Sequence, residues 1–168
     1  GLVLPGALSL DTTGTGLFDE FSDLPGVGSL PVLSLGTVVD SYLLHADRDP
    51  ASTDLSPYDG SITFDLDILG VIVRNRTFDL LPVGTDGFIG APGTSYPPFN
   101  GRGLEFAGGD FFEISADRRT LQFHMVLENI MDEIRVVTAA RVPGPEALTV
   151  VVLGGLLAAG LRRLRRPG

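Results

Sequence analysis

The chain has 168 residues, no Cys, and 12 basic against 21 acidic residues, for a formal net charge of −9. Without Cys it cannot form disulfides, thiolate metal sites or a Cys nucleophile. The last 27 residues hold four Arg and one Glu, which leaves 8 Arg against 20 acidic residues, or −12, in residues 1–141. Such an acidic surface repels nucleic acid phosphates and anionic lipids, so we expect no nucleic acid partner.

The chain starts with an apolar run, GLVLPGALSL, that contains Ala7-Leu8-Ser9. A small residue on each side of a central one is the form of a signal-peptidase site. We therefore predict that residues 1–16 are a leader or the remnant of a signal peptide. The alternative is that they form a first β-strand or a disordered leader.

Residues 17–138 show the pattern of one all-β domain. Short apolar or alternating runs are interrupted by Gly, Pro, Asp and Asn at intervals of roughly 8 to 15 residues. This pattern predicts an antiparallel β-sandwich, which we expect to be jelly-roll-like. The predicted strands are Val38–Ala46, Ser61–Asp67, Leu69–Val73, Asp110–Ser115, Thr120–Leu127 and Asp132–Thr138.

Apolar and polar residues alternate most clearly in Thr120–Leu127. The alternation predicts four inward side chains: Leu121, Phe123, Met125 and Leu127. Asp117–Arg119 is predicted to be the hairpin turn that joins this strand to the preceding one. Residues 82–103 contain four Pro and six Gly and predict a long irregular loop, the kind of segment that often carries function.

A turn-rich segment after the first long strand contains a group of carboxylates, namely Asp47, Asp49, Asp54 and Asp59. Hard Ca²⁺ takes several oxygen ligands from flexible backbone, so these residues are a candidate calcium site. Asp and Pro also serve turns without any metal. Both interpretations stay open, and we expect no other cofactor.

The residues that could support catalysis are few. His45 and His124 are the only His residues, so one chain cannot supply a three-His metal site, and no Gly-x-Ser-x-Gly turn is present. Asp65 and Asp67 would lie about 7 Å apart on one strand face, where paired carboxylates could hydrolyse a glycoside. A solvated, charged face explains them more simply, so we expect a protein that is not an enzyme, with a polysaccharide hydrolase as the alternative.

Aromatic rings can contribute to sugar binding by stacking on the pyranose face. The rings available in predicted loops are Tyr58, Phe88, Tyr96 and Phe99, and the chain has no Trp.

The C-terminus combines three features in a fixed order. Residues 139–146 form a linker that ends in a Pro-rich motif, consisting of Val142, Pro143, Gly144, Pro145 and Glu146. Residues 147–161 are uncharged and mostly apolar. As a helix they would span roughly 22 Å, which is short for a bilayer core of about 30 Å. Residues 162–168 contain the Arg cluster: Arg162, Arg163, Arg165 and Arg166.

These features predict a separate, short transmembrane helix over residues 147–161. Pro143 and Pro145 cannot lie inside a helix, so the helix should begin near Glu146. By the positive-inside rule the Arg cluster stops transfer and keeps residues 162–168 in the cytoplasm, with the body outside the inner membrane. The alternative is an ordinary C-terminal core helix with a basic end.

This tail resembles the PEP-CTERM sorting signal of Gram-negative bacteria. Val142, Pro143 and Pro145 match its Val-Pro-Glu-Pro motif, whereas Gly144 stands where the family usually has Glu. The resemblance implies that exosortase is a partner, that the tail occupies the inner membrane transiently with the body in the periplasm, and that cleavage follows. The product would be released or attached at the cell surface, in bacteria that make exopolysaccharide.

The body also resembles ectodomains that accompany such tails. The segments that carry this resemblance are Gly36–Asp47, Gly60–Ile72, Ala91–Pro97, Arg102–Glu105 and Asp132–Thr138. The resemblance implies a secreted β-sandwich and brings no catalytic assignment. We therefore expect a non-enzymatic binding or structural module of the cell envelope or the exopolysaccharide matrix; the alternative is an envelope polysaccharide hydrolase.

Overall fold

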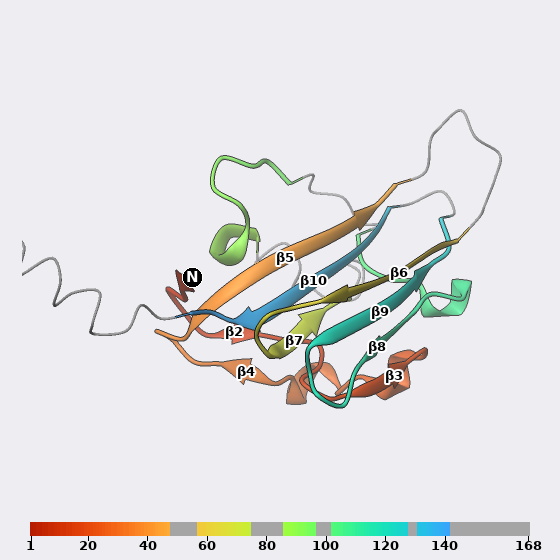
Figure 1. Ribbon diagram of the computed structural model, residues 1–168, viewed down its shortest axis with the longest axis horizontal. Coiled ribbons are helices and arrows are strands. Elements are labelled where there is room, and N and C mark those ends of the chain that lie inside the picture. Colours follow the sequence, from red (N-terminus) through yellow and green to blue (C-terminus); the bar gives the residue numbers. More distant parts are fainter. Residues whose placement is uncertain (48–56, 75–85, 97–101, 128–130, 142–168) are drawn as a thin grey trace, which may run out of the picture.

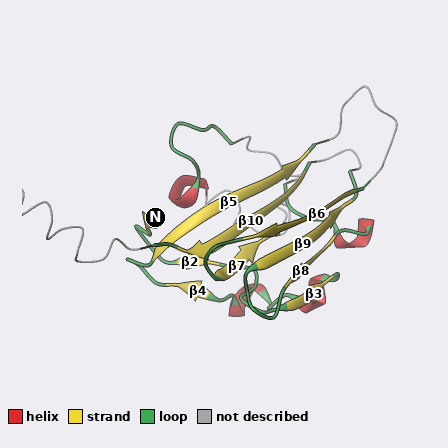
Figure 2. Cartoon of the chain, viewed as in Figure 1, coloured by secondary structure: helices red, strands yellow, loops and turns green. Residues whose placement is uncertain are grey.

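A computed structural model describes residues 1–47, 57–74, 86–96, 102–127 and 131–141 (Figures 1 and 2). The regular elements of the described chain are β-strands and short 3-10 or helical turns, and every strand pair among them is antiparallel. The predicted all-β, antiparallel class is therefore confirmed. The sorting motif, the predicted helix over residues 147–161 and the Arg cluster lie outside the described residues.

The first sheet has the strand order β1-β5-β10-β7. Its strands are β1 (Leu2–Val3), β5 (Val38–Ala46), β10 (Asp132–Ala139) and β7 (Ile68–Ile72). β10 pairs with β5 along its whole length, from Asp132 opposite Ala46 to Ala139 opposite Val39. Its pairing with β7 shifts register between Val137 and Thr138.

The second sheet has the strand order β3-β8-β9-β6. Its strands are β3 (Gly16–Phe18), β8 (Phe111–Ile114), β9 (Thr120–Met125) and β6 (Tyr58–Thr63). β8 and β9 form the predicted hairpin, in which Arg118 adopts φ of 60°. The backbone N–H of Arg118 donates to Ser115 O at 2.8 Å and closes the turn.

Short elements complete the described chain. β2 (Leu8–Ser9) pairs with β4 (Val32–Leu33) in a two-stranded sheet. The 3-10 turns are η1 (Phe21–Asp23), η2 (Val27–Ser29) and η3 (Phe106–Gly108), and residues 86–89 form a helical turn. In the part of the chain with described structure, no helix has the length and apolar character needed to cross a bilayer.

One apolar cluster, the inner core, receives side chains from both four-stranded sheets. The first sheet contributes Ile68, Val71, Ile134 and Val136, among others, and the second contributes Phe18, Phe112, Ile114, Leu121 and Met125. The rings of Phe18 and Phe112 stack with their centroids 4.8 Å apart. Alternating apolar residues on both sheets therefore meet in one cluster, as strand geometry requires of an apolar face.

A second cluster, the outer core, covers the opposite face of the first sheet. It joins Val39, Ile72 and Val137 of that sheet to side chains from the N-terminal segment and the loop, namely Leu4, Leu8, Leu10 and Ile89. Leu4, Leu8 and Leu10 are 2% exposed or less. The segment predicted as a leader thus packs into the fold of the described chain, and β1 is the first strand that the alternative interpretation allowed.

Five of the predicted strands agree with the structure to within one or two residues at each end, and one does not. β6 was expected at Ser61–Asp67 but spans Tyr58–Thr63, because the chain turns between Phe64 and Asp67 into β7. The placement of Asp65 and Asp67 on a strand face was therefore wrong. In β9, Leu121 and Met125 are buried as predicted, as is Leu127 just beyond it, whereas Phe123 is half-buried.

Candidate functional site

A buried network of charged side chains joins the long loop to β10. Asp86, in the helical turn, accepts hydrogen bonds from Arg102 Nη1 and Arg135 Nη2, each at 2.5 Å. Arg102 Nε donates to Glu133, whose Oε1 lies 3.1 Å from Nδ1 of His45. The side chains of Arg102 and Arg135 are only 2% and 5% exposed. Buried charges need partners of this kind, and here two guanidinium groups share two carboxylates.

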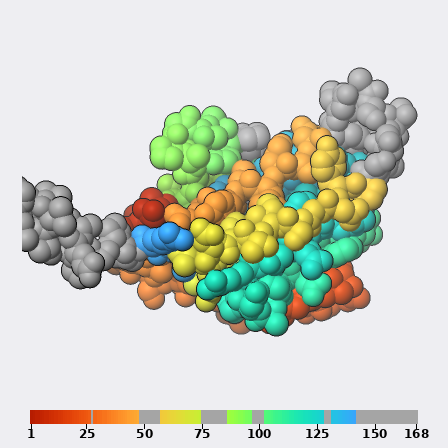
Figure 3. Space-filling view, viewed as in Figure 1, coloured from red at the N-terminus to blue at the C-terminus, as the bar shows by residue number. Residues whose placement is uncertain are grey.

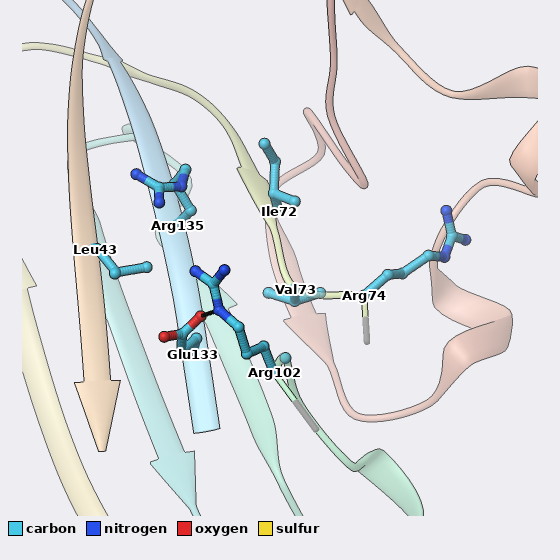
Figure 4. A pocket seen from close by; sticks show the side chains of 8 residues that line it. Leu43, Ile72, Val73, Arg74, Arg102, Glu133 and Arg135 are labelled. Carbon is cyan, nitrogen blue, oxygen red and sulfur yellow. Dashed lines mark hydrogen bonds and ion pairs between the residues drawn. The ribbon is translucent and has the colours of Figure 1, made fainter. Parts of the chain in front are cut away.

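Strand alternation explains why β10 supplies two members of this network. Glu133 and Arg135 alternate with Ile134 and Val136, which pack in the inner core. Their side chains therefore point to the opposite, outer face of the first sheet. Figure 4 shows Arg135 and Glu133 on β10 with Arg102 beside them.

Backbone hydrogen bonds fix Arg102 in this position. Glu133 N donates to Gly103 O at 3.2 Å, and Leu104 N donates to Val73 O at 2.9 Å. Residues 102–104 are thereby tied to the ends of β10 and β7, so Arg102 enters the network from a fixed backbone.

The network keeps the Arg102 guanidinium charged. Burial alone would lower the pKa of Arg102, but the hydrogen bonds and negative charges of Asp86 and Glu133 more than offset burial and raise this pKa above its ordinary value. Removal of either carboxylate would leave the buried Arg102 cation with less opposite charge beside it. Loss of one partner from a buried ion pair strongly destabilises a fold.

Tyr96 lies against both arginines. Its ring centroid is 5.5 Å from Cζ of Arg102 and 5.3 Å from Cζ of Arg135, within the range of cation–π attraction. Its hydroxyl oxygen accepts a hydrogen bond from Ala91 N at 2.8 Å. Gly90 is required beside it, because a Cβ there would lie 2.7 Å from the Tyr96 ring and 2.4 Å from Asp86 O.

A groove of about 390 Å³ runs beside this network, between β5 and the loop. Its polar lining includes Ser41, Tyr96 and Arg135, and its apolar lining includes Leu43, Ile89 and Pro92. In the space-filling view the loop forms the green knob next to the orange surface of β5 (Figure 3). The volume is in the range of small-molecule sites, which combine apolar walls with a few polar groups.

The predicted calcium residues are only partly described. Asp47 follows β5 and is exposed, whereas Asp59 lies in β6 of the other sheet with its Oδ1 2.6 Å from Nδ1 of His124. Asp49 and Asp54 lie outside the described residues. The structure thus gives Asp59 a His partner and leaves the calcium site a prediction.

The carboxylates considered for glycoside hydrolysis are solvated. Asp65 and Asp67 have side chains 87% and 54% exposed, and each pairs with an arginine, Asp65 with Arg141 at 3.3 Å and Asp67 with Arg119 at 3.2 Å. This agrees with the simpler interpretation of a charged surface. His45 and His124 lie in different sheets and bond to different acids.

A group of three acidic side chains that no sequence pattern indicated could hold a metal ion. One carboxylate oxygen from each of Glu105, Asp110 and Asp132 lies within 4.8 Å of the other two. Asp110 also accepts hydrogen bonds from Glu105 N at 2.6 Å and Val126 N at 2.7 Å, so it fixes the backbone around η3. Oxygen ligands of this type suit a hard cation such as Ca²⁺.

The sequence contained one usable signal for the buried charge network. The alternation in DEIRVVT, residues 132–138, places Ile134 and Val136 on one strand face and Glu133 and Arg135 on the other. It could not indicate that this second face is covered, because the covering residues, Asp86 and Arg102, are distant in sequence.

Comparison of the chain with protein-family models, with curated proteins and with solved structures found no match.

Proposed function

We propose that this chain is an exported protein of a Gram-negative cell envelope or exopolysaccharide matrix that exosortase sorts through its C-terminal signal. The observation that carries the proposal is the order of three features after Arg141: the Val142–Glu146 motif, the short apolar segment 147–161, and the Arg cluster. Each feature has its own physical role as a helix break, a membrane segment and a cytoplasmic stop.

In this proposal the body is a non-enzymatic β-sandwich that works as a binding or structural module. Two four-stranded antiparallel sheets that share the inner core support a sandwich, with a jelly-roll-like arrangement as the finer proposal. The acidic composition of residues 1–141 suits partners that are not anionic, such as a neutral polysaccharide.

The positions of the chain ends are compatible with a tail in the membrane. β10 ends at Ala139, whose partner Val39 also pairs with Leu2 of β1. Gly1 lies next to Ala140, since a Cβ on Gly1 would be 2.9 Å from the Ala140 Cβ. The described N-terminal residues and the exit toward the sorting motif therefore share one end of the body, which would be the membrane-proximal end.

Mass spectrometry of the C-terminus tests the sorting proposal. The full chain is expressed in a Gram-negative host that has exosortase, and surface material is recovered. We expect a mature C-terminus between Pro143 and Glu146. Recovery of surface protein that extends intact to Gly168 would contradict the proposal.

A charge variant tests the role of the Arg cluster. Replacement of Arg162, Arg163, Arg165 and Arg166 by Gln should abolish membrane retention and processing together, because the apolar segment then has no cytoplasmic stop. The matched control is Arg119→Gln with Arg141→Gln, two exposed arginines of the body, which should leave processing unchanged.

A further inference from the structure

We propose that the groove between β5 and the loop residues 89–96 binds an uncharged sugar unit. This inference rests on the proposed function and names the ligand class for the body. It follows from four properties of the groove: its charge balance, its two hydroxyl groups, its apolar wall, and the rigidity of its walls.

The charge balance disfavours an anionic ligand. The guanidinium groups of Arg102 and Arg135 are matched by the carboxylates of Asp86 and Glu133. Asp40 also lines the groove and adds a carboxylate to it. The described lining thus offers no unmatched positive charge that a carboxylate, sulfate or phosphate would require.

The hydroxyl groups favour a ligand that accepts hydrogen bonds. Ser41 Oγ accepts from Arg135 Nη1 at 3.2 Å, and the Tyr96 hydroxyl accepts from Ala91 N at 2.8 Å. Each hydroxyl has one hydrogen to donate, and among the described residues neither hydrogen is used. A purely apolar ligand would remove water from both hydroxyls and offer no acceptor in its place, and this cost in free energy disfavours its binding.

The apolar wall favours a ligand with carbon faces as well as hydroxyl edges. Leu43, Ile89 and Pro92 line the groove beside the two hydroxyls. A pyranose ring combines C–H faces, which pack on such side chains, with hydroxyls that accept from Ser41 and Tyr96. An uncharged sugar therefore matches both the polar and the apolar parts of the lining.

The walls are held before any ligand arrives. Asp86 fixes Arg135, Arg135 donates to Ile89 O at 3.4 Å, and both arginines lie against the Tyr96 ring. Binding then needs little ordering of the protein, which is the main benefit of preorganisation.

Nuclear magnetic resonance tests the proposal on the full ¹⁵N-labelled chain, kept in a detergent without a sugar headgroup. The neutral probes are maltose, cellobiose, lactose and N,N′-diacetylchitobiose, and the charged probes are digalacturonic acid and the glucosamine dimer. We expect at least one neutral disaccharide to shift the amide signals of Ser41, Leu43, Gly90 and Ala91 at millimolar concentration. We expect weaker or no shifts of these signals with the charged probes.

Two matched variants locate the site. Ala91→Trp places a large ring in the groove from an exposed position and should weaken binding of the neutral probe at least tenfold. Leu17→Trp, at an exposed position of β3 in the other sheet, should leave binding unchanged. Unshifted groove signals with every neutral disaccharide, preference for a charged probe, or full binding by Ala91→Trp would each overturn the proposal.

The outcomes separate this inference from the proposed function. If neutral sugars shift only signals of the second sheet, such as those of Gln122 and Ser61, the groove is not the sugar site. The proposal that the body is a matrix-binding module would then still hold. If the C-terminus is unprocessed and the groove binds a neutral sugar, the exosortase proposal is contradicted and the proposed sugar site is supported.

Discussion

The two faces of the first sheet differ in chemistry, although both are built on β5, β10 and β7. The inner face meets the second sheet through apolar side chains such as Ile134 and Val136. The outer face is apolar at one end, where Leu10 and Val137 pack, and charged at the other, where Arg102 and Arg135 are buried with Asp86. The inner face can hold the fold by burial alone, whereas the outer face also depends on specific pairs of charges.

The difference affects how each face tolerates change. An apolar core loses free energy in proportion to the atoms removed and the cavity left behind. A buried ion pair loses much more when one partner is removed than it contributes as an intact pair, because the other charge stays buried without compensation. The following predictions measure each face separately.

The largest effect is expected in the inner core. Phe112 is fully buried and stacked on Phe18, so Phe112→Ala should lower the free energy of unfolding by about 3–5 kcal/mol. Urea denaturation followed by circular dichroism measures this. The neighbouring Leu17→Ala, at a side chain 52% exposed, is the control and should change stability by about 0.5 kcal/mol or less. Equal losses for the two variants would mean that the facing of β3 and β8 is wrong.

The free energy of unfolding should fall by about 3 kcal/mol when the outer-face network loses Asp86, the carboxylate shared by two arginines. Asp86→Ala removes the carboxylate that pairs with both Arg102 and Arg135. The matched control is Asp65→Ala, which removes an exposed carboxylate from its pair with Arg141 and should cost under about 1 kcal/mol. If Asp86→Ala is as mild as the control, the arginines are solvated and the network does not hold the loop.

Truncation of Phe123 is expected to lower the free energy of unfolding by less than truncation of a fully buried Phe. It is half-buried and its ring lies over Gly60 of β6, where a Cβ would come within 2.3 Å of the ring. Phe123→Ala should therefore cost about 2 kcal/mol, less than Phe112→Ala. Gly60→Ala is the complementary variant, because it forces the Phe123 ring to move. A destabilisation by Phe123→Ala alone, with Gly60→Ala neutral, would show that the two residues are not in contact.

Much of the fold was predictable because strand patterns are local. The alternation in Thr120–Leu127 identified β9, its inward face and the hairpin before it, and the β-branched run of Val38–Ala46 identified β5. Phe123 differs from the other inward residues because its partner across the strand pair is a glycine, which leaves its ring partly open to solvent. β6 was misplaced because the same Ile–Phe–Leu alternation continues through the turn after Thr63.

The candidate site was not predictable to the same extent, since its parts come from distant segments. Asp86 and Arg135 are 49 residues apart, and Arg102 and Glu133 are 31 apart. The Pro and Gly content of residues 82–103 did indicate a loop that could carry function, and Tyr96 was one of its candidate rings. In the structure Tyr96 lies against two buried arginines. No local pattern specifies which acid in an acidic chain will meet which arginine.

The smallest effect concerns an exposed carboxyl, Asp117, in the hairpin turn between β8 and β9. Hydrogen bonds from Ser115 Oγ and from Arg119 N to Asp117 lower the pKa of the Asp117 carboxyl below its ordinary value. A carboxyl with a lowered folded-state pKa stabilises the fold above its unfolded pKa, and this contribution is lost as the pH falls through the folded pKa.

Ser115→Ala removes the larger cause of the lowered pKa, which is the hydrogen bond from the Ser115 hydroxyl. The pKa of Asp117, followed by the Cγ signal in an NMR titration, should then rise toward its ordinary value. Asp117→Asn should reduce the loss of stability on acidification below the ordinary Asp pKa of about 3.9, because that residue then no longer titrates. Since the group is fully exposed, both changes should be slight beside those of Phe112→Ala and Asp86→Ala. An Asp117 titration that is the same in the Ser115→Ala variant and in the unaltered chain would show that the hydroxyl does not hold the turn.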